Sequence, residues 1–401
     1  MSTVLVTDVG RGSAVSIMRS LGRAGYRVIA ADANRRSAGY YSRHATARVR
    51  YPSPAEAPEE TVEALLDAVR RHAVDLVVPV TDEVILPLAA SRERFEGLCA
   101  LALPENGALA HAADKNATLE LAAGLGIPVP RTALVSTADE AVEAAGEIGW
   151  PVVVKPQSSV RFEDDGGVAR FGVRYAGDER ALRDEMARCE GRCEVLLQEY
   201  YRGEGHGVEL LLEAGRPLAA FQHRRLREIP LTGGMSSFRE SVPLDPVLLE
   251  QSVRLLEALD WTGLAMVEFK VGPGGPKLME VNGRVWGSLP LAVMSGMDFP
   301  ARLADLYLGA HRNGAALDTS YRVGVRAHNL DLELLWIGNV LRGRARYPFI
   351  ATPRRRAGLA AALRLLVPGE RFDILSWRDP VPGLYELGRI VAKLRRKVST
   401  A

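Results

Sequence analysis

Short apolar runs alternate with helix-like segments over the first hundred residues. The pattern predicts strands at Val4–Thr7, Arg27–Ala31 and Asp75–Val80, and helices over residues 13–24 and 58–72. Strands that are separated by helices predict a parallel sheet with helices on both faces. A polar connection, from Pro104 to Lys115, ends this region. We therefore predict a first α/β domain with a parallel sheet over residues 1–110.

The pattern changes after Asp114. Helices alternate there with several β-segments, which is typical of an α+β body and differs from the first domain. We predict this body over residues 111–310, with a flanking subdomain near residues 125–195 that closes as a lid. The last segment, residues 311–401, is predicted to be a basic and mainly helical extension.

Two strand-like arms joined by a Gly/Pro turn hold the most informative residues. Side chains alternate along each arm, which places Glu268 on one arm and Glu280 on the same face of the other. A turn centred on Gly274 makes Val271 face Lys277 and makes Glu268 face Glu280. Directly opposed side chains have Cβ atoms about 4.5–5.5 Å apart, so two facing carboxylates repel each other.

Two facing carboxylates need a compensating partner, which is either a shared proton or a cation. Asn282 adds a neutral oxygen on the same face as Glu268 and Glu280. Three oxygen donors without His or Cys suit a hard cation such as Mg²⁺ and not zinc. The alternative is a solvated hairpin in which Lys270 neutralises a neighbouring acid.

Lysines and a polar loop provide groups for the phosphates that commonly complete a Mg²⁺ site. Lys155 ends a buried apolar run, and Lys115 follows an acidic residue at a predicted helix start. Lysine is a compact, rotatable charge that suits phosphate oxygens, although a lysine after a strand also extends to solvent. In the loop over residues 156–167, Ser158 and Ser159 are candidate contacts. The same loop holds acids that repel phosphate unless they point outward: Glu163, Asp164 and Asp165.

A strand end near residue 198 offers groups for a nucleotide base. The candidates are Gln198, Glu199 and the backbone of Tyr200 and Tyr201, which follow the strand over residues 195–197. The next strand carries two further candidates, Glu209 for a ribose hydroxyl and the neighbouring His206.

A glycine-rich turn follows the first strand and leaves a second class of function open. Gly10 and Gly12 precede a helix, and Asp32 ends the second strand, as in dinucleotide-binding folds. A third glycine is missing, because Val15 stands in its place. We favour a structural role for this turn over NAD binding.

Composition and charge restrict the remaining classes. The 401 residues are 47% hydrophobic and 25% charged, which is ordinary globular usage. Three cysteines and the lack of a long apolar run predict a cytoplasmic protein without a membrane span. From Leu341 onward fourteen basic and four acidic residues give a net charge of +10, whereas residues 1–340 hold 37 basic and 45 acidic residues, a net charge of −8.

The basic tail contains two predicted amphipathic helices. One follows Arg354, Arg355 and Arg356 up to Leu366, and the other covers about residues 383–397. The favoured interpretation is packing of the extension on the acidic body, and the alternative is contact with an anionic membrane surface. Basic residues do not alternate with aromatic ones there, so we predict no nucleic-acid partner. A homodimer is compatible with the sequence.

The ordered set of motifs resembles the ATP-grasp superfamily of carboxylate–amine and carboxylate–thiol ligases. The resemblance covers about residues 1–310, and its most specific part is the E-x-N-x-R element twelve residues after a strand glutamate. It implies an ATP-grasp fold, in which residues 1–110 resemble the nucleotide-fold-like domain that precedes the ATP-grasp domain in this superfamily. The segments that carry it are Asp114-Lys115, Val154-Lys155-Pro156, Gln198-Glu199-Tyr200, Glu209, Met266-Val267-Glu268 and Met279-Glu280-Val281-Asn282-Gly283-Arg284.

The resemblance implies a role for each of these residues. Lys115 and Lys155 would contact ATP phosphates, Glu199 and the Tyr200-Tyr201 backbone would bind adenine, and Glu209 would hold ribose. Glu268, Glu280 and Asn282 would bind two Mg²⁺ ions, with Mn²⁺ as a substitute, and Arg284 would stabilise the acyl-phosphate transition state. A carboligase-like substrate loop would comprise His223, Arg224, Arg225, Arg227, Gly233 and Gly234.

The sequence therefore predicts a ligase that uses ATP and Mg²⁺ to join a carboxylate to an amine. A carboxylating or other non-amide ATP-grasp enzyme is the alternative within the same fold. An NAD-linked oxidoreductase and a catalytically silent nucleotide-binding module are the alternatives from other classes.

Overall fold

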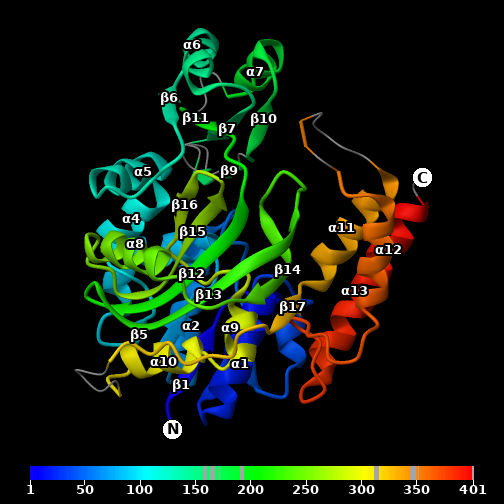
Figure 1. The fold of residues 1–401 in the computed structure, drawn as a ribbon. Coiled ribbons are helices and arrows are strands. Elements are labelled where there is room, and N and C mark those ends of the chain that lie inside the picture. The colour runs from blue at the N-terminus through cyan, green and yellow to red at the C-terminus, as the bar shows by residue number, and fades with distance from the viewer. Residues whose placement is uncertain are drawn as a thin grey trace.

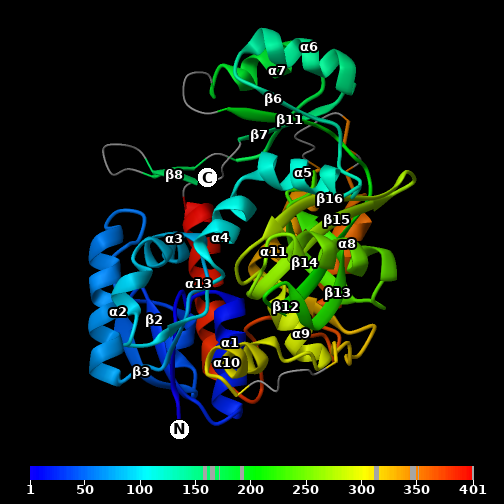
Figure 2. The same cartoon turned by 90° about the vertical axis from the view of Figure 1, so that its left-hand side faces the viewer.

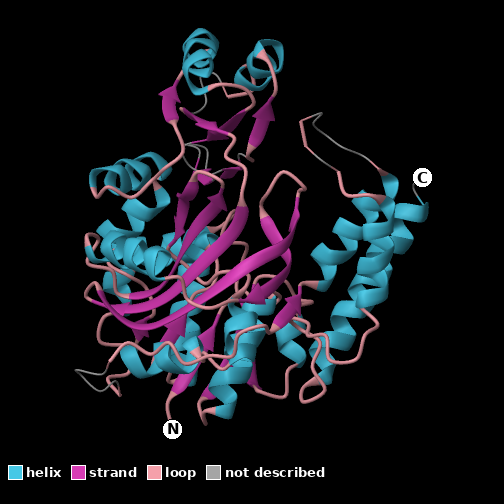
Figure 3. Cartoon of the chain, in the orientation of Figure 1, coloured by secondary structure: helices cyan, strands magenta, loops and turns pink. Residues whose placement is uncertain are grey.

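The computed structural model describes residues 1–156, 160–162, 168–170, 172–189, 194–310, 316–343, 349–350 and 352–399. Its elements form a parallel sheet, two antiparallel sheets and a short hairpin, with helices around them (Figures 1 and 3). The predicted combination of α/β and α+β regions is confirmed.

The first hundred residues form a five-stranded parallel sheet in the order β3-β2-β1-β4-β5. Alternate residues of β1 face different cores, because Val4 and Val6 join one hydrophobic cluster and Leu5 joins another. This explains why the strand is an uninterrupted apolar run. The elements are β1 (Thr3–Val6), α1 (Gly12–Arg23), β2 (Arg27–Asp32), β3 (Ala45–Arg50), α2 (Pro58–His72), β4 (Leu76–Val78), α3 (Asp82–Ala90), β5 (Ala100–Leu101) and α4 (Asn106–Ala113), with the short 3₁₀ helices η1 (Ala38–Tyr41) and η2 (Arg92–Phe95).

A four-stranded antiparallel sheet with two helices forms a separate layer at the top of Figure 1. Its strands are ordered β10-β7-β11-β6. This layer comprises β6 (Thr132–Val135), α6 (Ala138–Ile148), β7 (Val152–Pro156), β10 (Arg174–Ala176), α7 (Glu179–Met186) and β11 (Val195–Glu199), and β8 (Val160–Phe162) pairs with β9 (Val168–Arg170) in the short hairpin. Helix α5 (Lys115–Gly124) precedes the layer and packs against α4 and β16. The predicted lid region coincides with this layer, and its closing motion stays a prediction.

The largest sheet has six strands in the order β16-β15-β12-β13-β14-β17. Figure 2 shows it beside the N-terminal domain, with the smaller sheet above both. Its elements are β12 (Glu204–Glu213), β13 (Arg216–Ile229), β14 (Met235–Ser241), α8 (Pro246–Glu257), β15 (Gly263–Gly272), β16 (Gly275–Asn282), α9 (Leu289–Ser295), α10 (Phe299–Tyr307) and β17 (Arg326–His328). Because β17 belongs to this sheet, the sheet continues past residue 310, where we placed the domain boundary.

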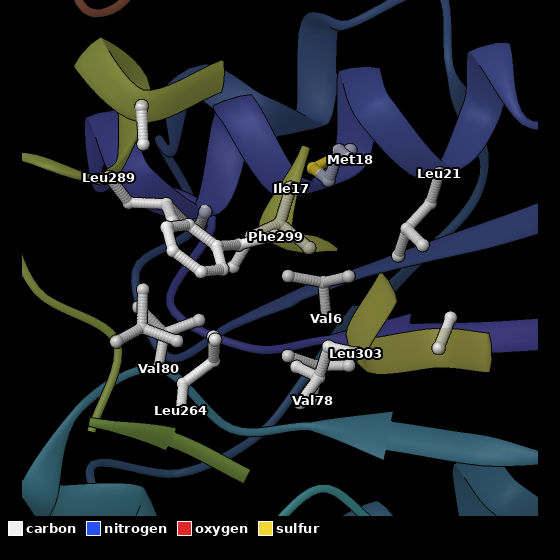
Figure 4. Packing of buried hydrophobic residues seen from close by; sticks show 14 of the residues in the cluster. Val6, Ile17, Met18, Leu21, Val78, Val80, Leu264, Leu289, Phe299 and Leu303 are labelled. Carbon is white, nitrogen blue, oxygen red and sulfur yellow. The ribbon is translucent and has the colours of Figure 1, made fainter. Parts of the chain in front are cut away.

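One hydrophobic cluster joins the N-terminal domain to the large sheet. Figure 4 shows residues of β1, α1 and β4, such as Val6 and Ile17, packed against Leu264 of β15 and Phe299 of α10. Since these side chains come from segments far apart in the sequence, the two parts share one core and hold a fixed position relative to each other.

The predicted hairpin forms, with one difference in its register. Glu268 faces Glu280 as predicted, but Val271 faces Pro276 and Gly272 faces Gly275. The predicted pairing of Val271 with Lys277 is therefore wrong. The turn is one residue tighter than we assumed, and an irregularity between Glu268 and Phe269 restores the register of the acidic pair.

Three helices of the C-terminal extension lie together along one side of the molecule (Figure 1). They are α11 (Leu330–Arg342), α12 (Arg355–Arg364) and α13 (Pro380–Ser399). Helix α11 packs against α12, and α13 packs against η1, where the rings of Tyr41 and Tyr385 stack at 4.7 Å. Arg19 Nε of the first domain donates to Asp379 Oδ2 at 2.9 Å in a buried ion pair. The extension thus contacts both the first domain and the large sheet.

The glycine-rich turn has a packing role in this structure. The backbone N–H of Gly10 donates to Asp32 Oδ2 at 2.7 Å, so that carboxylate is engaged within the turn. A Cβ on Gly12 would lie 2.8 Å from the Cβ of Asp373, which belongs to the extension. The space beside the start of α1 is therefore filled by protein, which supports the structural interpretation over NAD binding.

Candidate functional site

The two hairpin acids lie at the centre of the site, on one face of the large sheet. Glu268 pairs across the sheet with Glu280 on β16 and with Gly207 on β12. Asn282 Nδ2 donates to Glu268 Oε1 at 3.1 Å and to Glu280 Oε1 at 3.4 Å. The structure therefore brings together all three residues that we predicted as metal ligands.

Arg225 reaches Glu268 by crossing over β12. Its guanidinium forms ion pairs with Glu268 and, at 3.2 Å, with Glu228 Oε1, and it donates to the carbonyl of Gly234 at 2.8 Å. The crossing needs a strand without a side chain at this point. A Cβ on Gly205 would lie 2.9 Å from Arg225 Cδ.

The same requirement applies two residues further along β12. A Cβ on Gly207 would lie 2.4 Å from Cε1 of His223, which faces Gly207 on β13. The two glycines of β12 therefore leave room for two side chains of β13: Arg225, which crosses the strand to Glu268, and His223, which lies over Gly207.

The charges around the acidic pair push the two pKa values in opposite directions. Burial raises the pKa of Glu268 with a further contribution from Glu280, and Arg225 opposes this rise. Burial also acts to raise the pKa of Glu280, but the positive charges of Lys155, Lys115 and Arg225 outweigh it and hold the pKa below its usual value. Glu280 is therefore the more strongly ionised member of the pair.

Lys155 enters the site from the smaller sheet, where β7 ends. Its Nζ donates to Gln198 Oε1 at 2.7 Å, and Gln198 Nε2 donates to Thr132 Oγ1 at 3.0 Å, so neighbouring strands orient the ammonium group. Burial lowers the pKa of Lys155 to about 8, although Glu280 acts to raise it.

Lys115 enters the site from the start of α5. Asp114 caps this helix by accepting from the backbone N–H groups of Asn116 and Ala117, which fixes where the helix begins. Burial lowers the pKa of Lys115, and the charges of Glu280, Asp82 and Asp114 oppose that change. The ammonium groups of Lys115 on α5 and Lys155 on β7 therefore both act on the carboxylate of Glu280, one from a helix and the other from a strand.

Arg284 follows β16 and contacts the first domain. Its Nε donates to Asp82 Oδ2 at 2.8 Å, at the start of α3. The positive charge of Arg284 also lowers the pKa of Glu280. Its predicted catalytic role stays a prediction, and the structure places the residue where the first domain meets the acidic pair.

The predicted adenine-binding segment connects the two antiparallel sheets. The carboxylate of Glu199 accepts from Lys277 Nζ at 2.9 Å and from the backbone N–H of Arg131 at 3.2 Å. Tyr201 donates through its hydroxyl to the carbonyl of Gly275 at 2.7 Å. The ring of Tyr200 lies 5.8 Å from that of Tyr175. These contacts fix the segment beside the site, and its contact with adenine stays a prediction.

Glu209 is not brought to the site. Its side chain is fully buried, accepts from Ser288 Oγ at 3.0 Å and lies 2.9 Å from Nδ1 of His223. Burial raises the pKa of Glu209 to about 8 and lowers that of His223. These two residues form a buried pair on the face of the sheet that carries Glu268, and the ribose and substrate contacts that we predicted for them stay predictions.

Three other predicted residues also point elsewhere. Gln222 Nε2 donates to His206 Nδ1 at 3.1 Å, and Arg224 pairs with Glu240 at 2.8 Å, both on the opposite face of the sheet from Glu268. Arg227 pairs with Glu333 and lies over the rings of Phe238 and Trp336, at 4.6 and 5.0 Å. These side chains hold the sheet and the extension together. Ser158 and Ser159 lie outside the described residues.

Two residues that we did not predict for the site, Lys270 and Glu228, lie beside it; the sequence indicated Lys270 only as a neutralising partner in the alternative, solvated hairpin. Lys270 is on the same face of β15 as Glu268, and a Cβ on Gly233 would be 3.2 Å from its Nζ. Burial lowers the pKa of Lys270 and the nearby Glu228 opposes this change. The alternation that placed Glu268 also placed Lys270 on its face, so the signal was present. Gly233, Gly234 and Arg225 are the predicted substrate-loop residues that do lie here.

The lowered pKa of Lys155 predicts that ATP binding takes up a proton at alkaline pH. Lys155 is protonated below its pKa of about 8 and loses its proton above it, whereas a bound triphosphate raises the pKa again. We expect calorimetric titration of ATP in buffers of different ionisation enthalpy to show proton uptake near pH ~9 and less proton uptake near pH ~7.

Lys155→Arg is the matched control, because a guanidinium stays protonated over this range. Equal proton uptake in both proteins would contradict the prediction. Lys155→Ala removes a charge-assisted contact and is expected to raise the KM for ATP by roughly 10–100-fold.

The buried position of Glu209 predicts that it contributes little to nucleotide binding. Glu209→Gln keeps an acceptor for Ser288 in a neutral side chain of the same size. We expect the KM for ATP to stay within about twofold, since the residue does not reach the site. A large rise in that KM, with an unchanged melting temperature, would restore the ribose assignment.

Two family models match adjacent parts of the chain. A model described as "ATP-grasp domain" matches residues 108–198, and one described as "ATP-grasp in the biosynthetic pathway with Ter operon" matches residues 192–329. Together they cover the smaller sheet and the large sheet, which are the parts that hold the acidic pair and both lysines.

Curated relatives cover different shares of the chain. A formate-dependent phosphoribosylglycinamide formyltransferase of Synechococcus sp. is 35% identical over 146 residues, which is 36% of this chain and 35% of that protein. A ribosomal protein bS6–L-glutamate ligase of Shigella boydii is 27% identical over 216 residues, 52% of this chain and 68% of that protein. The match thus spans about a third of the first relative and about two thirds of the second.

The fold has counterparts among solved structures. A biotin carboxylase from Campylobacter jejuni, solved with a β,γ-ATP analogue, superposes with a TM-score of 0.61 at 18% identity, over 81% of this chain and 74% of that one. This likeness concerns the fold. The two family models, which together span residues 108–329, show that the chain belongs to the ATP-grasp superfamily.

Proposed function

We propose that the protein is an ATP- and Mg²⁺-dependent ligase that activates a carboxylate as an acyl phosphate and joins it to an amine. The observation that carries the proposal is the meeting of Glu268, Glu280 and Asn282 with the lysines of two other elements, Lys115 and Lys155. Acidic oxygens for a cation and ammonium groups for phosphate are what a nucleotide with a bound Mg²⁺ requires.

The donor set fits a metal ion whose coordination shell is completed by phosphate and water. Within the described ranges no group of three or more His, Cys, Asp or Glu residues gathers to hold a metal alone. Two carboxylates and one amide oxygen are a partial set, and Mg²⁺ commonly takes its other ligands from substrate phosphates and water. Asn282 now presents its amide nitrogen to both acids, so its side chain would have to turn to offer oxygen.

A carboxylate does not condense with an amine by itself, because it has no suitable leaving group, and phosphorylation supplies one. ATP supplies a phosphoryl group, and Mg²⁺ neutralises charge on the phosphates when both are bound. A carboxylate oxygen forms a bond to the γ-phosphorus while the bond to ADP breaks. The amine nitrogen then bonds to the acyl carbon, phosphate leaves and the nitrogen loses a proton, so the products are an amide, ADP and phosphate.

Residues of the chain have distinct tasks in this scheme. Lys155 and Lys115 hold negative charge beside Glu280, and Arg284 adds a donor from the side of the first domain. Arg225 lies where its fork-shaped guanidinium can also orient a substrate carboxylate. The loop that carries Gly233 and Gly234 borders this position. The bS6–L-glutamate ligase relative, which by its name joins an amino acid to a protein, supports the amide-forming class.

Trapping with hydroxylamine identifies the acid substrate before the amine substrate is known. The protein, ATP and Mg²⁺ are incubated with single carboxylic acids, including amino acids, formate and bicarbonate, and hydroxylamine replaces the unknown amine. We expect one class of acid to give both ADP and a hydroxamate that mass spectrometry identifies. ADP release with bicarbonate alone would favour the carboxylating alternative, and ATP binding without ADP release from any acid would favour the silent module.

Small molecules are thus the proposed substrates, and their identity follows from this screen. Among the described residues no helix is long and apolar enough to cross a membrane. We keep the homodimer as a prediction, which light scattering on the purified protein tests.

A further inference from the structure

The C-terminal extension exposes an apolar stripe on α12. Leu359 and Leu363 of α12 are 58% and 67% exposed and lie four residues apart on one face of the helix, and Leu366, in the turn that follows α12, is 80% exposed. The opposite face of α12 is the one that packs. Its Gly358 and Ala361 are buried against α11, where a Cβ on Gly358 would lie 3.1 Å from Leu341.

Basic residues border this stripe. Arg355 and Arg356 precede Leu359 by about one turn and lie on either side of the stripe, and Arg354 comes just before them. In the described part of the chain none of these three arginines forms an ion pair, whereas Arg364 turns back to Glu370 at 2.8 Å. The packing of the basic tail on an acidic body, which we favoured from sequence, therefore does not account for them.

Helix α13 repeats the pattern on the same side of the molecule (Figure 1). Its exposed apolar residues are spaced by three or four positions: Val381, Leu384, Leu387 and Val391. Trp377, just before this helix, is 99% exposed. A tryptophan is amphipathic and is enriched where protein meets the headgroup region of a bilayer.

We propose that the exposed faces of α12 and α13 dock on an anionic lipid surface. The two stripes have the composition of helices that lie in a membrane interface, where leucine and tryptophan enter the headgroup region and arginines contact anionic lipid. The segment has a net charge of +10 against −8 for the rest of the chain, so its attraction to an anionic surface exceeds that of the body. Docking of this kind leaves the ATP-grasp site on the other part of the molecule.

Vesicle sedimentation with the full chain tests the proposal. The vesicles are phosphatidylcholine alone and phosphatidylcholine mixed with phosphatidylglycerol, without nucleotide. We expect binding to the mixed vesicles, little binding to the neutral ones, and a marked loss in about 1 M salt, where the screening length is about 3 Å. Equal binding to both vesicles, or binding to neither, would overturn the proposal.

Two variants separate the apolar contribution to vesicle binding from the electrostatic contribution. Leu359→Ser/Leu363→Ser/Leu366→Ser is expected to lower partitioning by about tenfold or more, because these side chains supply the buried apolar area. Arg354→Gln/Arg355→Gln/Arg356→Gln is expected to lower it by roughly fivefold per charge. Leu98→Ser is the matched control, since Leu98 is an exposed leucine in the first domain.

The same variants test whether the stripe instead binds a second copy of this protein. If the stripe instead joins two copies, light scattering will show a dimer that the triple leucine variant converts to a monomer, and the lipid proposal is then wrong. Unchanged melting temperatures and an unchanged response to ATP show that the variants are folded.

Discussion

Replacing Glu280 with glutamine is expected to reduce ADP formation by about a thousandfold or more. Glu280 is the ionised member of the acidic pair, and Lys155 and Lys115 both lower its pKa. A neutral amide in its place cannot hold a divalent ion or balance these cations as a carboxylate does, and interactions of this kind contribute several kcal/mol to a transition state, of the order of 10²–10³ in rate for one donor. The measurement is ADP release with the acid that the hydroxamate screen identifies.

The fold should tolerate this change. Glutamine has the size of glutamate and keeps an oxygen for Asn282, and the change removes a negative charge that faces Glu268. We expect an unchanged or slightly raised melting temperature, and loss of the stabilisation that Mg²⁺ adds to ATP. Glu250→Gln on α8 serves as the control, because Glu250 is exposed and its ion-pair partner is Arg254 of the same helix. Normal turnover by Glu280→Gln would refute the metal assignment.

Replacing Arg239 with leucine is expected to lower the free energy of unfolding by about 3–5 kcal/mol, the usual cost of leaving one charge of a buried pair without its partner. Arg239 on β14 pairs with Asp373 of the extension, and both side chains are almost fully buried. Burial raises the pKa of Asp373, which the positive charge of Arg239 opposes. Equilibrium unfolding in urea measures the effect.

The double variant Arg239→Leu/Asp373→Leu decides whether the cost comes from the stranded charge. Two apolar side chains in place of both partners are expected to restore most of the lost stability, since buried pairs are often replaced by apolar residues at little cost. If the double variant is as unstable as the sum of both single variants, the pair is not coupled and the explanation fails.

The centre of the site could be predicted from the sequence because it depends on local rules. Alternation along the arms and a short Gly/Pro turn were enough to make Glu268 face Glu280, even though the turn itself is tighter than expected. Lys115 was placed by the helix that Asp114 caps, and Lys155 by the apolar strand that it ends. Each of these signals lies within a few residues of the side chain that it places.

The surroundings of other predicted site residues come from distant parts of the chain and could not be predicted from the sequence. Alternation gives the face of Glu209, but only Ser288 and His223 show that this face is covered. Arg227 was predicted to contact substrate because its segment resembles a carboligase-like substrate loop, whereas its partners Glu333 and Trp336 belong to α11, about a hundred residues later. A charge pattern predicts a cation in a region and does not predict which element packs over it.

The two glycines of β12 restrict how this strand can vary. Strands β13 and β15 flank β12 with backbone hydrogen bonds along its length, so the strand has little freedom to move aside for a new methyl group. Alanine at position 207 would force His223 away, and alanine at position 205 would displace Arg225 from Glu268. A strand with no reactive side chain at these positions would then be among the segments of the protein least tolerant of substitution, and a search for inactive variants that still fold should find them there.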